Sequence, residues 1–163
     1  MQFGEIVEGY DIPVLNERAI RAAAGIMFVL LFMALMEIRF EKDFLMAKCV
    51  IVAFLIDFVI RIFITPKYAP LLIIGRIIVW NQDPEWVGAS QKKFAWMIGL
   101  VLSVVMFSIL VVMNTHNTAT GLGCLACLVF LFFESAFGIC IGCKLYPLFF
   151  KQKAQHCPGN VCD

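Results

Sequence analysis

The sequence predicts an all-α integral membrane protein, a bundle of four transmembrane helices with a short interfacial or re-entrant helix between the second and the third. Of its 163 residues, 62% are hydrophobic and only 15% are charged, too few polar residues for the surface of a soluble domain. The apolar residues fall into long blocks bounded by charge clusters, as transmembrane helices separated by short loops do. The expected surroundings are therefore a lipid bilayer. The net charge of +1 predicts no nucleic-acid partner.

The first helix is expected over residues 18–38, after a cytoplasmic N-terminal segment at residues 1–17. Asn16 precedes Glu17 and a long apolar run, the order of a helix cap followed by an acidic residue in the first turn. The N-terminal segment lacks the pattern of a cleaved signal peptide, because acidic residues come before any basic one.

The second helix is expected over residues 44–64, because Pro66 disfavours helical geometry at the residue before it. The next apolar piece, residues 71–80, is too short to span the hydrocarbon as a helix, so an interfacial or re-entrant segment is expected there. The third helix, residues 94–113, contains no charged residue.

The fourth helix is expected in the stretch Gly121–Cys143, which carries a Cys-x-x-Cys pair at each end. The four-helix membrane domain then covers residues 18–150, and residues 151–163 form a cysteine-containing cytoplasmic tail.

The basic residues orient this bundle. With both termini in the cytoplasm, most Lys and Arg residues lie on the inner side, as the positive-inside rule requires. The expected location is the bacterial inner (plasma) membrane. The inner residues are Arg18, Arg21, Arg61, Lys67, Arg76, Lys92, Lys93, Lys144, Lys151 and Lys153, and the outer ones are Arg39, Lys42 and Lys48.

Three charged residues are expected within the membrane, away from the interfaces. Asp57 and Arg61 lie four residues apart on one helix face, and Glu134 is expected at the same depth as Asp57. Arg61 is therefore a candidate bridge between both acids. A charge within a membrane normally pairs or faces a functional cavity, so the cluster is either structural or a proton or substrate site.

The cysteines form two unlike pairs. Cys124 and Cys127 lie at the outer start of the fourth helix and share a helix face with Glu134. Cys140 and Cys143 lie at its inner end and point away from that face in an unbroken helix. Gly138 or Gly142 would have to break the helix to bring the inner pair onto it.

The inner pair also belongs to a candidate metal set. Cys140, Cys143, Cys157 and Cys162 supply four sulfur ligands on the reducing side of the membrane, where metal binding or transient redox chemistry is commoner than stable disulfides. Zinc or an iron–sulfur cluster is the corresponding cofactor, although the spacing is only loosely compatible with zinc.

Several motifs give the chain a family resemblance. They are Asn16-Glu17-Arg18, Asp57-Phe58-x-x-Arg61-x-Phe63, Tyr68-Ala69-Pro70-Leu71, Lys93-Phe94-Ala95 and Glu134-x-x-x-Gly138-Ile139-Cys140-x-Gly142-Cys143-x-x-Tyr146. On these residues the chain resembles an uncharacterised bacterial four-helix membrane family, domain of unknown function 4395. The resemblance implies a four-helix inner-membrane fold with the Cys140/Cys143 pair as its signature, in a setting of thiol redox and sulfur metabolism. Cys124, Cys127 and the cysteines of the tail lie outside that pattern.

Three functions remain open. The first is a membrane thiol protein in which Cys140 and Cys143 carry out disulfide or persulfide redox chemistry or sulfur transfer, assisted by Glu134, with a thioredoxin-like or sulfurtransferase protein as partner. The second is a small permease or transporter subunit for a sulfur-containing anion, using Arg61 and Arg76. The third is a metal-binding or structural membrane subunit.

Overall fold

The computed structural model describes residues 3–115, 118–140 and 143, and within them the chain is mostly helical. The helices and strands follow one another as β1 (Val14–Asn16), α1 (Glu17–Phe40), α2 (Leu45–Val59), the π-helical turn η1 (Ile60–Ile64), the 3-10 turn η2 (Pro66–Tyr68), α3 (Pro70–Ile78), β2 (Trp86–Gly88), α4 (Ala89–Phe107), the π-helical turn η3 (Ser108–Val112) and α5 (Thr118–Phe137).

Three helices are long and apolar enough to cross a membrane. They cover Glu17–Phe40, Ala89–Val112 and Thr120–Phe137. Helix α2 has only 15 residues, but η1 continues it directly to Ile64, where the chain turns at Pro66. The coarse expectation of a helical protein with segments long and apolar enough to span a membrane is therefore confirmed.

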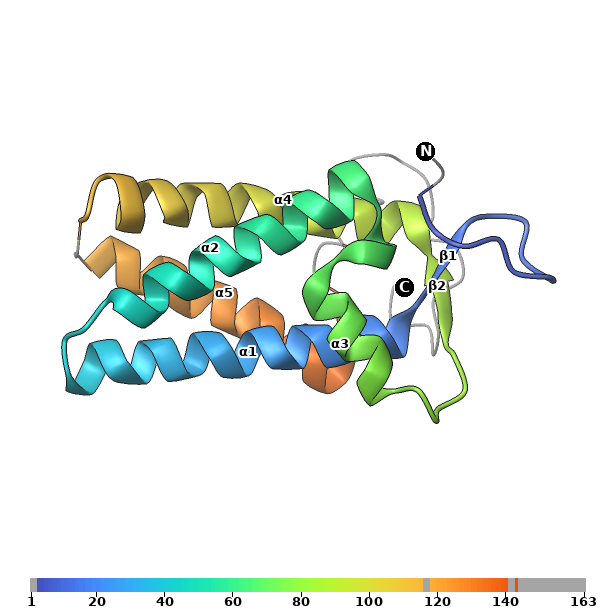
Figure 1. The fold of residues 1–163 in the computed structure, drawn as a ribbon, viewed down its shortest axis with the longest axis horizontal. Coiled ribbons are helices and arrows are strands. Elements are labelled where there is room, and N and C mark those ends of the chain that lie inside the picture. Colours follow the sequence, from blue (N-terminus) through green and yellow to red (C-terminus); the bar gives the residue numbers. More distant parts are fainter. Residues whose placement is uncertain (1–2, 116–117, 141–142, 144–163) are drawn as a thin grey trace.

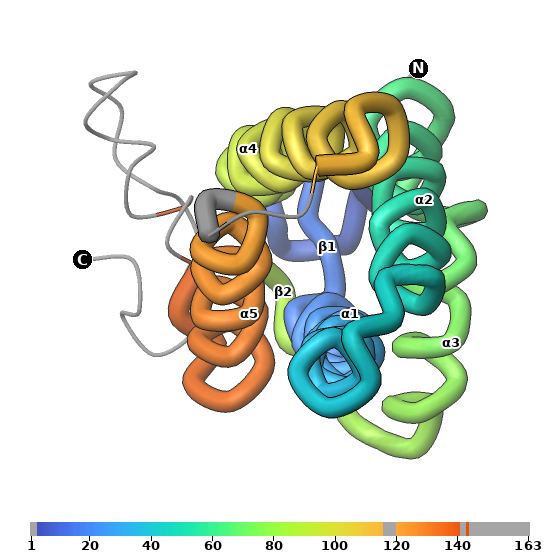
Figure 2. Tube along the Cα trace, turned by 90° about the vertical axis from the view of Figure 1, so that its left-hand side faces the viewer, coloured from blue at the N-terminus to red at the C-terminus, as the bar shows by residue number. Residues whose placement is uncertain are grey.

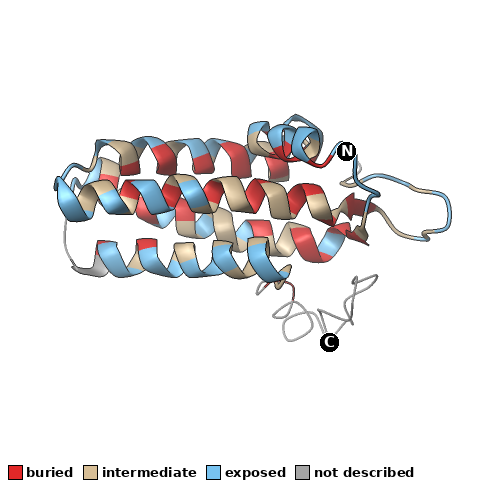
Figure 3. Ribbon diagram, turned by 90° about the horizontal axis from the view of Figure 1, so that it is seen from below, coloured by how far each residue is buried: buried red, intermediate tan, exposed pale blue. Residues whose placement is uncertain are grey.

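Helices α1, α2, α4 and α5 lie side by side, as Figure 1 shows, and Figure 2 views them end-on. Helix α1 packs against α5 on one side and against α2 and α3 on the other, and α2 packs against α4. Helices α4 and α5 touch each other only sparingly. Figure 3 shows exposed residues along the outer faces of the long helices. Many large apolar side chains are among them, which suits contact with lipid.

A two-stranded antiparallel ribbon joins the starts of α1 and α4. It pairs Val14 with Gly88 and Asn16 with Trp86, and the backbone N–H of Glu17 donates to Glu85 O at 2.7 Å. Asn16 also caps α1 by accepting from the backbone N–H of Arg18 at 3.1 Å, as the sequence predicts. These three-residue strands were not predicted, because such short strands leave no alternating pattern.

The ribbon also corrects the start of the third long helix. Helix α4 begins at Ala89, five residues before the predicted start at residue 94, and so includes Lys92. The sequence predicted Lys92 to lie on the inner side, before the third helix. Instead it lies in the first turns of the helix and is buried.

The short apolar piece forms α3, which packs along α1. Gly75 makes this approach possible, because a Cβ there would lie 2.4 Å from the carbonyl oxygen of Ala19. A helix in this region was predicted over residues 71–80 and occurs at Pro70–Ile78.

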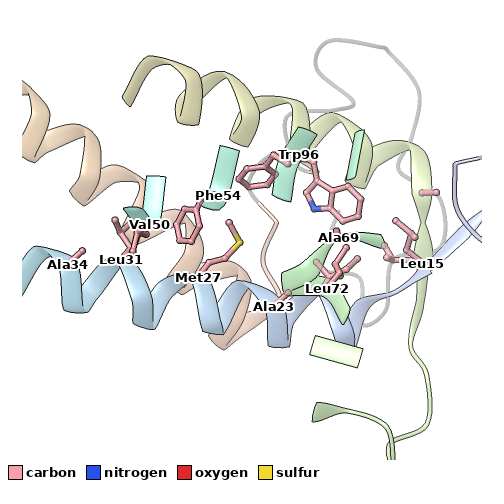
Figure 4. Close-up of a cluster of buried hydrophobic side chains, with 14 of the residues drawn as sticks. Leu15, Ala23, Met27, Leu31, Ala34, Val50, Phe54, Ala69, Leu72 and Trp96 are labelled. Atoms are coloured by element: carbon pink, nitrogen blue, oxygen red, sulfur yellow. The ribbon is translucent and has the colours of Figure 1, made fainter. Parts of the chain in front are cut away.

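The main core runs between α1, α2, α3 and α4. Figure 4 shows it along α1, with Met27 and Phe54 near its middle and Trp96 at the end that carries the ribbon. A second apolar cluster consists of one buried residue from each of α2, α4, η3 and α5: Ile51, Met106, Leu110 and Cys124.

Helix α5 ends at Phe137, six residues before the predicted end at Cys143. Gly138 adopts a φ of +67°, in the left-handed region that glycine enters without steric cost. Its N–H donates to Glu134 O at 3.2 Å, and the N–H of Ile139 donates to Phe133 O at 3.1 Å. The break that the sequence analysis required for the inner cysteine pair therefore occurs, at Gly138.

Candidate functional site

A buried lysine, Lys92, connects the ends of three helices. Its ammonium lies 2.8 Å from Glu17 Oε2 on α1 and 3.3 Å from Glu134 Oε1 on α5. The Lys92 side chain is only 1% exposed, and Glu17 is also buried. Unpaired charges in such a place are strongly destabilising, so each member of this group, the Lys92 triad, holds the others in position.

Arg21 caps the C-terminal end of α5. Its guanidinium donates to the backbone carbonyls of Ser135 at 3.4 Å and Ala136 at 3.1 Å, which are among the carbonyls left without helical partners at a C-terminus. Its side chain also lies 3.5 Å from where a Cβ of Gly138 would stand. Arg21 therefore fixes the point at which the chain leaves α5 toward the inner cysteines.

The Cys140 and Cys143 thiols are neighbours, and Cys140 shares a cavity wall with Glu134 of the Lys92 triad. The backbone N–H of Cys143 donates to Cys140 Sγ at 3.3 Å, and the two thiols share a hydrogen bond. Both residues are buried, at 6% and 1% exposure, and Lys92 interacts electrostatically with both. Both are free thiols, so the structure shows a neighbouring dithiol and no disulfide.

The surroundings of the Cys143 thiol favour its protonated form. The hydrogen bond to Cys140 raises the pKa of the Cys143 thiol most, burial raises it further, and the positive charge of Lys92 opposes both. Cys143 therefore keeps its proton and donates it toward Cys140.

A cavity of about 190 Å³ borders this site between α2, α4 and α5. Cys140, Glu134 and Cys127 all contribute to its wall. The wall is otherwise mostly apolar and is completed by Met27, Phe54, Phe58, Ala95, Trp96, Ile98, Gly99, Leu102, Ser103, Phe130 and Leu131. The break at Gly138 thus brings a member of the inner pair to the same cavity as Cys127 and Glu134.

The predicted ion pair of Asp57 and Arg61 forms, but it contacts Leu71 and Trp96 instead of Glu134. Asp57 and Arg61 make an ion pair of 2.5 Å at one face of α2 and η1. Asp57 Oδ1 also accepts from the backbone N–H of Leu71 at 2.9 Å, and the guanidinium of Arg61 lies 5.1 Å from the centre of the Trp96 ring. This pair therefore anchors α3 and Trp96.

The expectation that Arg61 bridges both acids is not met. Glu134 has Lys92 as its ionic partner, and among the described residues no ion pair joins it to Arg61. Sequence reasoning missed Glu17 and Lys92 as site residues, because Glu17 was interpreted as an acidic residue of the first helical turn and Lys92 as one of the inner basic residues. One signal was available in the sequence. Glu17 and Lys92 stand near the starts of two helices that run in the same direction, so an acid and a base lie at the same end of the bundle.

The outer cysteines take separate environments. Cys124 is buried in the second core cluster beside Met106, whose Sδ lies 2.7 Å from where a Cβ of Gly123 would stand. Cys127 is partly exposed and lines the cavity. A structural role fits Cys124, and only Cys127 shares a space with the inner pair.

The metal prediction falls largely outside the described residues. Cys157 and Cys162 belong to the tail beyond residue 143, so the four-cysteine set stays a prediction. Among residues 3–115, 118–140 and 143, no three His, Cys, Asp or Glu side chains are grouped so as to hold a metal ion. The described part of the site is a dithiol beside an ion cluster.

The comparisons with known proteins identify the family. A family model described as "Domain of unknown function (DUF4395)" matches residues 15–151, from β1 through both members of the inner cysteine pair. No curated protein and no solved structure matches the chain. Since the match covers most of the sequence and includes every residue of the Lys92 triad, the chain belongs to the DUF4395 family.

Proposed function

We propose that this protein is a membrane thiol protein whose Cys140 and Cys143 cycle between a dithiol and a disulfide or persulfide. The observation that carries the proposal is the pair of hydrogen-bonded thiols, one of which lines the same cavity as Glu134, the ionic partner of the buried Lys92. The ammonium of Lys92 also acts electrostatically on both sulfurs. A nearby cation favours the thiolate, which is the reactive form in thiol exchange. The pair thus handles reducing equivalents or sulfane sulfur.

The roles of the two sulfurs follow from their surroundings. Cys143, whose pKa is raised, bears the proton, and Cys140 is the attacking sulfur. Glu134 lies at the same cavity wall and is 20% exposed, so it takes up the proton that leaves Cys140 when the thiolate forms and passes this proton on to the partner. In disulfide formation the pair gives two electrons and two protons to its partner, and a new S–S bond joins the two sulfurs.

We also propose that the protein lies in a bacterial inner membrane with four spans and both termini in the cytoplasm. The π-helical turn η1 extends α2 to 20 residues, long enough to span a bilayer, although α2 alone is too short. The positive-inside rule supports this orientation, because most Lys and Arg residues lie near the end that carries the ribbon.

In this orientation the inner pair is at the cytoplasmic face. A soluble thioredoxin-like or sulfurtransferase protein is then the natural partner, because each such protein presents a reactive sulfur that can exchange with Cys140.

The test is thiol trapping in a variant that keeps only the inner pair, with the other five cysteines replaced by alanine. After mild oxidation with diamide, we expect Cys140 and Cys143 to resist alkylation and to recover with dithiothreitol. In matched variants that carry Cys140→Ser or Cys143→Ser, the remaining thiol should stay alkylatable. Full alkylation of both thiols after every oxidant would refute the proposal.

The alternatives find less support. An anion permease based on Arg61 and Arg76 would need guanidinium groups free for substrate, but Arg61 pairs with Asp57 and Arg76 lies 3.8 Å from Glu5. Uptake of a sulfur-containing anion that depends on Arg61 would favour that alternative. A metal-binding subunit would require the tail cysteines, and elemental analysis of the full chain tests it directly.

A further inference from the structure

The cavity beside Cys140 has the chemistry of a binding site for a small apolar ring. Its volume of about 190 Å³ is below the range of about 300–1,000 Å³ that is typical for drug-sized ligands. Four aromatic side chains contribute to its wall: Phe54, Phe58, Trp96 and Phe130. A polar molecule enclosed there would leave most of its hydrogen-bonding groups unpaired, whereas a flat ring with few polar atoms would not.

The cavity borders two helices that make few contacts with each other. It lies against α4 and α5, which touch each other only sparingly. One of its aromatic residues, Phe130, is 41% exposed on a helix of transmembrane length. Phe130 therefore belongs both to the cavity wall and to the surface that would face lipid, so a molecule dissolved in the bilayer would reach this wall without crossing water.

The cavity also contains the reactive groups of the proposed function. Cys140 and Glu134 line it, together with Ser103, which carries a hydroxyl group. An occupant would thus contact the attacking sulfur and a carboxylate that can transfer a proton. A lipid-soluble molecule with an apolar ring would fit this cavity and enter it from the bilayer. To oxidise the dithiol, it must accept two electrons and two protons.

We propose that this cavity binds the ring of a membrane quinone, which oxidises the Cys140/Cys143 dithiol. This inference rests on the proposed thiol function and adds the class of its oxidant. In the net step the two S–H bonds break and one S–S bond forms. The quinone takes up two electrons and two protons, and its two carbonyl oxygens become the hydroxyl groups of the quinol. A thiol partner in the cytoplasm then returns the disulfide to the dithiol.

The experiment uses the purified full-length chain, reduced and then freed of reductant under anaerobic conditions, with ubiquinone-1 as the probe. The fully substituted ring of this quinone leaves no free ring carbon to which a thiol could add. We expect one quinone to be reduced for each pair that becomes resistant to alkylation. Cys140→Ser and Cys143→Ser should each abolish this reaction.

Two phenylalanine substitutions on α4 test the location. Ala95→Phe fills the cavity and should slow oxidation by ubiquinone-1 by about tenfold, the loss expected from overpacking a binding site. Val101→Phe, at a position that is 62% exposed on the same helix, should match the wild type. Both variants should still form the disulfide with diamide.

Binding is measured separately from reaction. In a Trp80→Phe, Trp86→Phe background, Trp96 is the remaining tryptophan, and ubiquinone-1 should quench its fluorescence in a saturable way that Ala95→Phe weakens. If diamide closes the disulfide but ubiquinone-1 neither closes it nor quenches Trp96, the quinone site is refuted and the thiol function stands. If Ala95→Phe behaves as the wild type, the cavity is not the site. If no oxidant closes the disulfide, the proposed function itself fails.

Discussion

Lys92 is the residue on which the inner end of the bundle depends. Its ammonium contacts carboxylates from α1 and α5, and it interacts electrostatically with both cysteines that follow α5. The next residue along α4, Lys93, lies instead over the ring of Phe3, with its ammonium 5.1 Å from the ring centre. Two adjacent lysines therefore have opposite roles, one within the ion cluster and one outside it.

This contrast predicts the effect of removing each charge. Lys92→Met leaves Glu17 buried without its partner and should lower the free energy of unfolding by about 3 kcal/mol or more. Lys93→Met should change stability by about 0.5 kcal/mol or less, as a surface substitution does. Thermal unfolding in detergent measures both. A triple variant, Lys92→Met with Glu17→Gln and Glu134→Gln, should recover part of the loss, and equal melting temperatures for the two single variants would contradict the burial of this cluster.

A second prediction concerns the pH at which Cys143 reacts. Its pKa is raised, so at neutral pH it is mostly protonated and alkylation should accelerate only at alkaline pH. Cys140→Ala removes the hydrogen bond that contributes most to this rise, so the Cys143 pKa falls and its alkylation profile moves to lower pH. Rates of iodoacetamide labelling across pH, in a background without the other cysteines, give both profiles. An unchanged profile in Cys140→Ala would show that the hydrogen bond does not control Cys143.

At the scale of single elements, the end of α5 determines which residues share the cavity. Gly138 has a positive φ, Arg21 caps the preceding carbonyls, and the chain turns toward the Lys92 triad. Without this turn, an unbroken helix would direct the inner cysteines away from Glu134. The backbone conformation of Gly138 therefore determines where the inner cysteines lie relative to Glu134 on α5.

Substitution of that glycine should weaken both stability and thiol chemistry. Gly138→Ala forces a residue with a Cβ into the left-handed region, at a cost of about 1 kcal/mol. It should also slow closure of the Cys140–Cys143 disulfide by diamide, because the turn toward the triad is disfavoured. Gly138→Asn should retain more of both properties, since asparagine tolerates this conformation. The matched control is Gly121→Ala on the same helix, where a Cβ meets open space, and an equal effect at both glycines would contradict this role.

How far the sequence predicts these elements depends on the kind of signal. The cap at Asn16 and the ion pair of Asp57 and Arg61 follow from spacing within one helix, and both are observed. The pairing of Lys92 with Glu17 depends on strands of three residues that bring distant helices together, and spacing along the chain does not contain that information. For Gly138, the sequence marked two possible breaks, and the three-dimensional packing of Arg21 accompanies the one that occurs.

At the scale of the whole molecule, the buried ion pairs lie toward one end. The ribbon is on the right in Figure 1. Glu17 and Lys92 closely follow its two strands along the chain, and Arg61 lies over the ring of Trp96 in the first turns of α4. At the opposite end, Lys48 Nζ donates to Asn114 Oδ1 at 2.6 Å and joins the start of α2 to the end of the third long helix. This asymmetry fits a protein with one chemically active face.

The proposed four-span topology makes a prediction about sidedness. Lys42, in the loop between α1 and α2, should face the outside, and Gln82, in the loop between α3 and β2, should face the cytoplasm. In a cysteine-free background, a membrane-impermeant maleimide added to intact cells should label Lys42→Cys, and it should label Gln82→Cys only after the cells are permeabilised. Labelling of both positions from the same side would rule out a crossing by α2 and η1.

The long separation between the members of the Lys92 triad also orders the biogenesis of the protein. Glu17 is synthesised 75 residues before Lys92, and Lys92 is synthesised 42 residues before Glu134. During synthesis from the N-terminus, the first helix therefore enters the membrane with an acid that has no basic partner from α4 yet. The ion cluster is complete only when the last helix has docked, so its closure marks the end of assembly. The thiol pair follows that helix in the chain, and it reaches its place only in a bundle that is already complete.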